Sequence, residues 1–320
     1  MHRKTLPILV LFVMVFTWSC DVTESSPNAG VEETIAKIIS ADNESFGFQG
    51  WGDEEFTLDK DTQNNAAGIT MTPDLERDSS YIWNFRKIGM QHTREMIIEV
   101  EDDTSALALI TDHVTGTFHI RQFDRYWITD TRWVRGDSVQ FSQKNIDYTL
   151  NHRVAFRKRM NAAGQEFWEP MATTLVTGGA GETVSINSLN WVRGDSVFNM
   201  SDFESSFYPT RGPVAYFLLN ARQINMEMGN SSDASELVKG RLEYYRTPDR
   251  PGMSRPLKLR YRETLDSGDK VYGGRIARVN GPVQFFQGTL EVLDSRTLFD
   301  HAFTDYSNAV LAWSFEVHHR

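Results

Sequence analysis

The amino-acid sequence predicts a mainly β protein made of antiparallel β-sandwich modules. Short β-prone runs such as Met96–Val100, Ala106–Ile110 and Thr117–Ile120 alternate with turn signals, at intervals of roughly 8–12 residues. This spacing is typical of antiparallel sandwiches or barrels. Immunoglobulin-like sandwiches belong to this class. Because this sequence has neither a core disulfide nor a spacing diagnostic of one topology, its resemblance to them is one of fold class alone.

The chain opens with the pattern of an export signal. Met1–Lys4 is basic, Leu6–Phe16 is almost entirely apolar, and Thr17, Trp18 and Ser19 then lead to a cysteine. An apolar run this short does not span a bilayer, which takes about 20 residues. Residues 1–19 are therefore interpreted as a signal peptide.

The cysteine that follows the signal resembles the lipobox cysteine of bacterial lipoproteins. The box reads Thr17-Trp18-Ser19-Cys20, and the small Ser19 fits cleavage before the cysteine. The resemblance covers the first 20 residues and implies that Cys20 carries the lipid that anchors the mature chain, through acyl chains worth about 0.8 kcal/mol per buried CH₂. It implies a place in the bacterial cell envelope, on the periplasmic or cell-surface side. An ordinary secretory signal followed by a chance cysteine is the alternative.

Two domains are predicted after a polar tether at residues 20–30. Val31, Ile35, Ile38 and Ile39 fall on one face of a helix, so a short helix is expected to begin the first domain, residues 31–160. Apolar patterning lapses at Asn161–Gly164, which predicts a hinge. Residues 161–320 are expected to form one or two further sandwich modules.

The β-prone runs continue through both predicted domains. Turn signals lie at Glu101–Asp103, at Asp112 with Gly116, and at Gly178–Gly181. The remaining predicted strands are Tyr126–Thr129, Asn151–Lys158, Thr173–Val176, Val184–Trp191, Val214–Leu219, Leu242–Tyr245, Leu257–Tyr261, Val283–Phe286, Leu290–Val292 and Ala309–Val317.

The charge balance argues against nucleic-acid binding. Removal of residues 1–19 takes away Arg3 and Lys4 and no acidic residue, which leaves 31 basic against 43 acidic residues and a formal charge of −12. Such a surface repels phosphate groups. With one cysteine in the chain, no intramolecular disulfide can form.

A heptapeptide occurs twice, at Trp133–Val139 and at Trp191–Val197. We interpret each copy as a strand that ends in a buried Trp, a tight turn in which Gly adopts a positive φ and Asp bonds its own backbone, and a Val that starts the next strand. The residues of these two predicted turns are Trp133, Gly136, Asp137, Trp191, Gly194 and Asp195.

The heptapeptide also permits two functional readings. Arg-Gly-Asp is an integrin-recognition tripeptide. Gly-Asp-Ser resembles the nucleophile block of the SGNH hydrolases, with Ser138 or Ser196 as nucleophile. That family adds a late Asp-x-x-His, whereas here His301 directly follows Asp300. Because no base is indicated for the hydroxyl, the structural interpretation is preferred.

No cofactor and no metal site are predicted. Asp59 and Asp61 are spaced like the first two ligands of an EF-hand calcium-binding loop. Such a loop would need glycine at position 64 and glutamate at position 70, where this chain has Asn64 and Thr70, so a solvated acidic loop is favoured. His113 and His119 lie six residues apart across Gly116, a spacing expected to place them on facing strands of a hairpin without a third ligand.

The sequence thus predicts a membrane-anchored envelope lipoprotein with a binding or structural role. Its partners would be the membrane, through the lipid anchor, and a protein or glycan, with no nucleic acid. Aromatic residues make up 12% of the chain, enough to supply platforms for sugar rings or a protein partner besides the core. The alternative is a hydrolase of envelope or extracellular glycans that uses paired carboxylates.

Overall fold

The computed structural model describes most of the chain after residue 27. The described residues are 28–41, 54–58, 69–71, 81–129, 132–232, 235–245, 253–277 and 283–317. The predicted signal peptide, Cys20, and the pair Asp59 and Asp61 lie outside them.

The protein is mainly β, which confirms the predicted class, and every pairing between the described strands is antiparallel. The larger sheet has twelve strands: β1 (Glu54–Leu58), β2 (Ile69–Met71), β3 (Tyr81–Asp102), β4 (Ser105–Thr129), β5 (Arg132–Met160), β6 (Glu166–Thr173), β7 (Val176–Ala180), β10 (Tyr208–Pro209), β12 (Glu236–Tyr245), β13 (Met253–Pro256), β16 (Phe285–Asp294) and β17 (Asn308–Glu316). The smaller sheet has five: β8 (Val184–Arg193), β9 (Ser196–Met200), β11 (Gln223–Asn230), β14 (Arg260–Thr264) and β15 (Lys270–Arg275).

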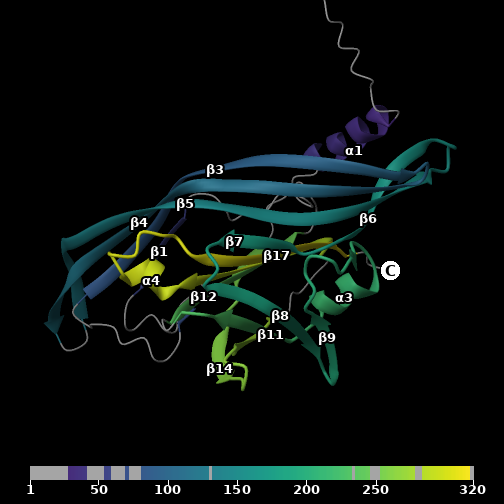
Figure 1. Ribbon diagram of the computed structural model, residues 1–320. Coiled ribbons are helices and arrows are strands. Elements are labelled where there is room, and N and C mark those ends of the chain that lie inside the picture. The colour runs from purple at the N-terminus through teal and green to yellow at the C-terminus, as the bar shows by residue number, and fades with distance from the viewer. Residues whose placement is uncertain are drawn as a thin grey trace, which may run out of the picture.

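The strands β3, β4 and β5 form a long ribbon that arches over the other strands (Figure 1). They contain 22, 25 and 29 residues, so the short strands predicted for this region are parts of three long ones. The turn predicted at Glu101–Asp103 joins β3 to β4 and is confirmed.

The turn predicted at Asp112 and Gly116 is wrong, because β4 passes through both residues. Asp112 is tolerated within the strand because its carboxylate accepts two hydrogen bonds from Arg94 on β3, at 2.7 and 2.9 Å. The side chain of Met90 fills the space beside Gly116, where an added Cβ would lie 2.4 Å from the Met90 sulfur.

Three hydrophobic cores hold the layers together. The first lies between the smaller sheet and β12, β16 and β17, and there the rings of Trp191 and Trp313 meet edge to face with centroids 5.3 Å apart. The second lies between the ribbon and β7, β16 and β17 around Phe85 and Phe118. The smaller sheet and the strands β12, β16 and β17 of the larger sheet therefore form a sandwich. The ribbon, which belongs to the larger sheet, arches over these strands and adds a further layer (Figure 1).

The third core joins one end of the ribbon to helix α1 (Ala29–Ala41). Ile35 and Ile39 are fully buried against Ala108, Ile110 and Val154. The helix predicted from the spacing of these isoleucines is therefore confirmed. It lies beside the turn that joins β3 to β4.

The predicted hinge at Asn161–Gly164 is a hairpin turn within one sheet. The backbone of Asn161 donates to Gln165 at 2.9 Å, Gly164 has a φ of 76°, and β5 pairs with β6 on either side of the turn. Strands from both predicted domains are hydrogen-bonded in the twelve-stranded sheet. The division into two domains itself stays a prediction.

Two further local predictions are wrong. Val214–Leu219 is not a strand but lies in the short helix α3 (Pro213–Leu219), which buries Ala215 and Leu218 three residues apart. Pro is favourable in the first turn of a helix, where its missing N–H has no partner to lose. Another short helix in the described residues is α4 (Ser295–Phe299), whose N-terminal backbone is capped by Asp294.

The predicted Gly-rich turn at Gly178–Gly181 is wrong for its first three residues, which belong to strand β7, whereas Gly181, with a φ of 72°, lies in the bend that follows the strand. Gly178 and Gly179 have φ angles of 157° and 146° and lie between β5 and β17. A Cβ at Gly178 would lie 1.9 Å from the carbonyl oxygen of Thr149, and one at Gly179 would lie 2.1 Å from that of Asn308. Glycine is required here because the neighbouring backbones approach so closely.

Candidate binding groove

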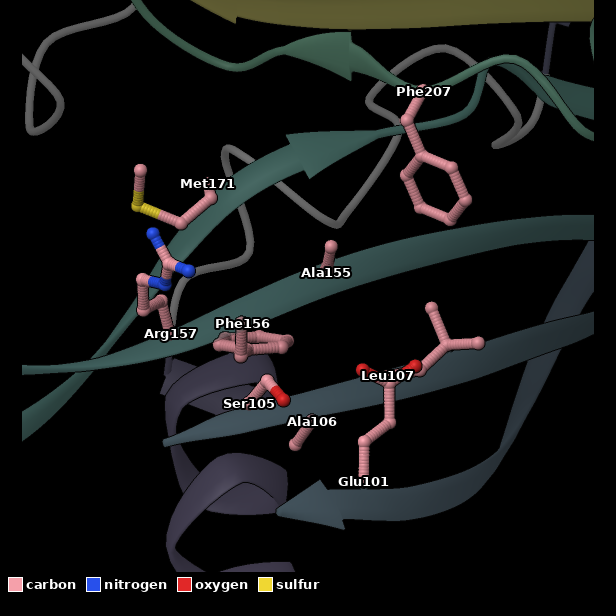
Figure 2. Close-up of a pocket in the computed structure, with 9 residues that line it drawn as sticks. All are labelled: Glu101, Ser105, Ala106, Leu107, Ala155, Phe156, Arg157, Met171 and Phe207. Atoms are coloured by element: carbon pink, nitrogen blue, oxygen red, sulfur yellow. The ribbon is translucent and has the colours of Figure 1, made fainter. Parts of the chain in front are cut away.

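A groove of about 320 Å³ lies between the ribbon and β6, at the end of the ribbon that also contacts α1 (Figure 2). It is open to solvent on one side, and most of its surface is apolar. The residues that line it are Glu101, Ser105, Ala106, Leu107, Ala155, Phe156, Arg157, Met171 and Phe207.

The floor of the groove comes from paired residues of β4 and β5. Leu107 lies opposite Ala155, and Ala106 lies opposite Phe156. Successive side chains of a strand point to opposite faces. Ala106 and Phe156 are therefore buried under α1, whereas Leu107 and Ala155 lie on the other face, where they are half-buried.

Phe207 forms one wall and is 38% exposed. It is carried by a short segment that is fixed on both sides: Phe203 and Tyr208 are buried, and Tyr208 pairs with Thr173 of β6. Asp202 accepts hydrogen bonds from the backbone and the hydroxyl of Ser205 at 3.2 and 2.8 Å. The ring of Phe207 is thus held in position without being buried.

Met171 forms the facing wall on β6. Its carbonyl oxygen accepts from the backbone of Thr210 at 3.1 Å. Arg211 forms ion pairs with both Glu169 of β6 and Glu316 of β17. These bonds fasten β6 to the C-terminal strand, so the wall is part of the rigid sheet.

One acidic and one basic side chain stand at the edges of the groove. Glu101 and Arg157 are both exposed, and in Figure 2 the Arg157 guanidinium lies toward Met171 while Glu101 extends from the opposite side. Glu101 is the single carboxylate among the described lining residues. The groove therefore offers apolar contact and two charges of opposite sign, but no pair of carboxylates.

The structure places the two heptapeptides in different conformations. In the second copy, Trp191 is fully buried in β8, Gly194 has a φ of 59°, and Asp195 leads into β9. The tight turn that the sequence predicts is therefore present there.

In the first copy, β5 runs without interruption through Trp133, Gly136 and Asp137, so the predicted turn is wrong. The reason is the partner strand: β4 continues alongside, and the ring of Tyr126 lies over Gly136, where an added Cβ would fall 2.1 Å from Tyr126 Cε2.

The residues of the hydrolase reading are not assembled. Ser138 lies on β5 and Ser196 begins β9, and both are exposed. His301 Nδ1 lies 3.0 Å from the hydroxyl of a different serine, Ser142.

The two histidines considered as metal ligands lie on one strand, β4, and not on facing strands of a hairpin. His113 Nδ1 is 3.3 Å from the Thr149 hydroxyl, and His119 packs edge-on against Phe141. Burial, together with Arg121 and Arg86, lowers the pKa of His119. In the described ranges, no group of three or more His, Cys, Asp or Glu residues is placed to hold a metal ion.

Sequence reasoning missed the groove because its walls come from segments that are distant in the sequence. Met171 lies just before a predicted strand, and Phe207 lies in a segment for which no element was predicted. The available signal was Phe207-Tyr208-Pro209, two aromatic residues and a proline. This combination is compatible with a short edge strand.

A polar cluster around Glu291 lies in the core between the ribbon and β16. Glu291 accepts hydrogen bonds from Lys87 at 2.6 and 2.7 Å, from Tyr306 at 2.8 Å and from Asn308 at 2.9 Å. Burial alone would raise the pKa of Glu291, but Lys87 and Lys239 outweigh it and lower the pKa to about 2. Because both carboxylate oxygens are bonded internally, this cluster stabilises the fold.

No protein-family model, no curated protein sequence and no solved structure matches this chain. Along the described ranges, none of the helices has the length and apolar character to span a membrane.

Proposed function

We propose that this protein is a lipid-anchored protein of the bacterial cell envelope that binds a protein partner through the groove between β4, β5 and β6. Cys20 carries the lipid, and the folded body performs no catalysis. The observation that carries the proposal is the groove itself, with its apolar walls at Leu107, Met171 and Phe207 and its two charged edges.

The chemistry of the groove suits a polypeptide better than a glycan. Sugar sites combine aromatic platforms with several convergent polar groups, whereas the walls here offer one exposed aromatic ring and mostly aliphatic contact. Glu101 and Arg157 are complementary to a segment with an apolar residue between a basic and an acidic one.

The position of α1 supports a groove close to the lipid surface. The helix begins at Ala29, nine residues after Cys20, and nine extended residues reach at most about 30 Å. Since α1 packs on the ribbon end that contains the groove, a lipid on Cys20 holds the groove near the membrane.

The alternative of a glycan hydrolase finds no support in the groove. Hydrolysis of a glycosidic bond uses two carboxyl groups about 5–10 Å apart. Glu101 is the one carboxyl group among the described lining residues.

Site-specific photo-crosslinking in intact cells tests the groove. A photoreactive amino acid replaces Leu107 in the full chain, and the matched control replaces Thr115, which lies on the same face of β4 outside the groove. We expect a discrete protein adduct at position 107 and none at 115. Binding of the purified partner should weaken about tenfold in Phe207→Ala. Identical adducts at both positions, or unchanged binding in Phe207→Ala, would contradict the proposal.

The anchor is tested separately by Cys20→Ser. We expect the variant to leave the membrane fraction or to accumulate as an uncleaved precursor. Lipid labelling that persists in Cys20→Ser would refute the anchor and leave the groove proposal intact.

A further inference from the structure

The face of the ribbon that is turned away from α1 continues past the groove along three strands. Ala108 and Ile110 of β4 pack under the helix, so Leu107 and Leu109 point to the opposite face. Residues that are directly paired on neighbouring strands share a face. The pairing of β3, β4 and β5 thus defines a surface that we call the flanked face: Glu95, Ile97, Glu99, Leu107, Leu109, Arg153, Ala155 and Arg157.

Opposite charges lie along the two sides of the flanked face. The charged side chains along these sides, all exposed, are Glu95, Glu99 and Glu101 of β3 and Arg153 and Arg157 of β5. Figure 2 shows Glu101 and Arg157 on opposite sides at the groove end. β4 lies between the two sides. The flanked face is therefore acidic along one side, apolar in the middle and basic along the other side.

These charges are not neutralised within the described part of the chain. None of the five side chains forms an ion pair there. Glu169, which lies opposite Arg157 on β6, is itself paired with Arg211, so the β5 side stays basic. Separated rows of unpaired charge favour a partner with the opposite pattern.

The apolar centre of the flanked face is accessible to solvent. Ile97 is 59% exposed, and Leu107, Leu109 and Ala155 beside it are half-buried. Phe207, which is 38% exposed, stands at the groove end of this centre. Bulky apolar side chains that remain accessible in one place indicate a contact surface.

The flanked face offers a partner side chains and no free backbone groups in its centre. Along this region β4 is paired with β3 on one side and with β5 on the other. A segment that covers the leucines therefore cannot extend the sheet. Because backbone groups buried against apolar side chains need hydrogen-bond partners, the segment has to satisfy them internally, as a helix does.

We propose that the partner presents an amphipathic helix to the flanked face, an inference that rests on the proposed function of the groove. The helix lies along β4, with its apolar stripe on Leu107 and Leu109, basic residues over β3 and acidic residues over β5. Two strand spacings measure about 10 Å, close to the diameter of a helix. The strand from Glu95 to Glu101 is about 20 Å long, the length of about 13 helical residues.

The acidic side of the flanked face argues against lipid as its occupant. Anionic headgroups attract basic residues at a membrane surface. Here Glu95, Glu99 and Glu101 are all exposed along one side, and they would repel such headgroups. A helix with one basic and one acidic side neutralises both rows.

Two photoreactive positions in the full chain measure the conformation of the bound segment. Leu107 and Thr111 lie on the same face of β4, four residues or about 13 Å apart. This distance corresponds to about nine residues of a helix but to about four residues of an extended segment. After crosslinking in intact cells, mass spectrometry should find the two sites about nine residues apart in one partner. Thr115, beyond the flanked face, remains the control.

Reversal of one charge tests the sides of the flanked face. Arg153→Glu should weaken binding of the purified partner about fivefold at low salt. The effect should shrink in 1 M salt, where charges are screened beyond about 3 Å. The matched control is Arg260→Glu, which reverses an exposed arginine of β14 outside the flanked face. It should leave the affinity unchanged.

Failure of the helix is distinguishable from failure of the groove. An adduct at position 107 without one at 111, crosslinked sites about four residues apart, or equal affinities of Arg153→Glu and Arg260→Glu would each overturn the helix and leave the groove proposal standing. Lipid adducts in place of protein adducts at both positions would overturn the helix and the protein partner together. The absence of any adduct at 107 above the control at 115 would do the same.

Discussion

The ammonium group of Lys87 lies 2.6 Å from Oε1 and 2.7 Å from Oε2 of Glu291, a residue 204 positions further along the chain. Both side chains are buried, and they join the long ribbon to β16. The same carboxylate accepts hydrogen bonds from Tyr306 and Asn308. The ribbon, which carries two strands of the groove, is therefore fastened to the sandwich by an ion pair in the core.

We expect Lys87→Met to be strongly destabilising, because it leaves the Glu291 carboxylate buried without the ammonium group that hydrogen-bonds both of its oxygens. Loss of one partner of a buried pair costs about 3–5 kcal/mol, measurable as a lower free energy of unfolding in urea. The control is Lys37→Met, which removes an ion pair with Glu33 whose side chains are 73% and 67% exposed. That change should cost less than about 1 kcal/mol. Equal effects of the two substitutions would contradict the role of the Lys87 pair.

His152 predicts a pH dependence of stability in a defined window. Burial lowers its pKa to about 4, with Asp112 acting to raise it and Arg94 to lower it further. The folded protein therefore favours the neutral ring. Its contribution is complete above pH 6.5, the ordinary pKa of histidine, and is lost as the pH falls toward 4.

The comparison with His152→Gln isolates this effect. Between pH 6.5 and 4 the wild-type protein should lose about 3 kcal/mol more of its unfolding free energy than the variant. Urea unfolding at a series of pH values measures the difference. Parallel curves for the two proteins over this window would show that His152 is not buried in its neutral form.

The features that the sequence predicted correctly depend on local patterns. The spacing of Ile35 and Ile39 predicts α1, and alternating β-prone residues predict the strands, because each pattern is complete within a few residues. Asp112 was misinterpreted as a turn because Arg94, which neutralises it, lies on another strand. Likewise, Leu107 and Phe207 line one groove only because β6 pairs with both β5 and β10. A single sequence does not reveal such pairings.

Gly178→Ala should disrupt the contact between β7 and the ribbon. The added methyl group would lie 1.9 Å from the carbonyl oxygen of Thr149, a backbone atom that moves only with its strand. We expect a loss of about 3 kcal/mol or more, measured by thermal unfolding. Gly164→Ala is the control, since Gly164 also has a positive φ, 76°, but nothing within 4 Å. Its cost should be about 1 kcal/mol, from the backbone angle alone, and a similar cost at Gly178 would contradict the close approach.

The repeated heptapeptide allows one substitution to be compared in two environments. At Gly194, φ is 59° and the surroundings are open, so Gly194→Ala should lower the unfolding free energy by about 1 kcal/mol through backbone strain. At Gly136 the added methyl group meets the Tyr126 ring 2.1 Å away, and that ring can swing into solvent. Gly136→Ala should therefore leave global stability within about 0.5 kcal/mol of wild type while hydrogen exchange becomes faster in residues 125–135. The contrary outcome is a lower global stability in Gly136→Ala with unchanged hydrogen exchange in residues 125–135. It would place the strain in the backbone of β5 and show that the contact between Tyr126 and Gly136 does not hold the hairpin.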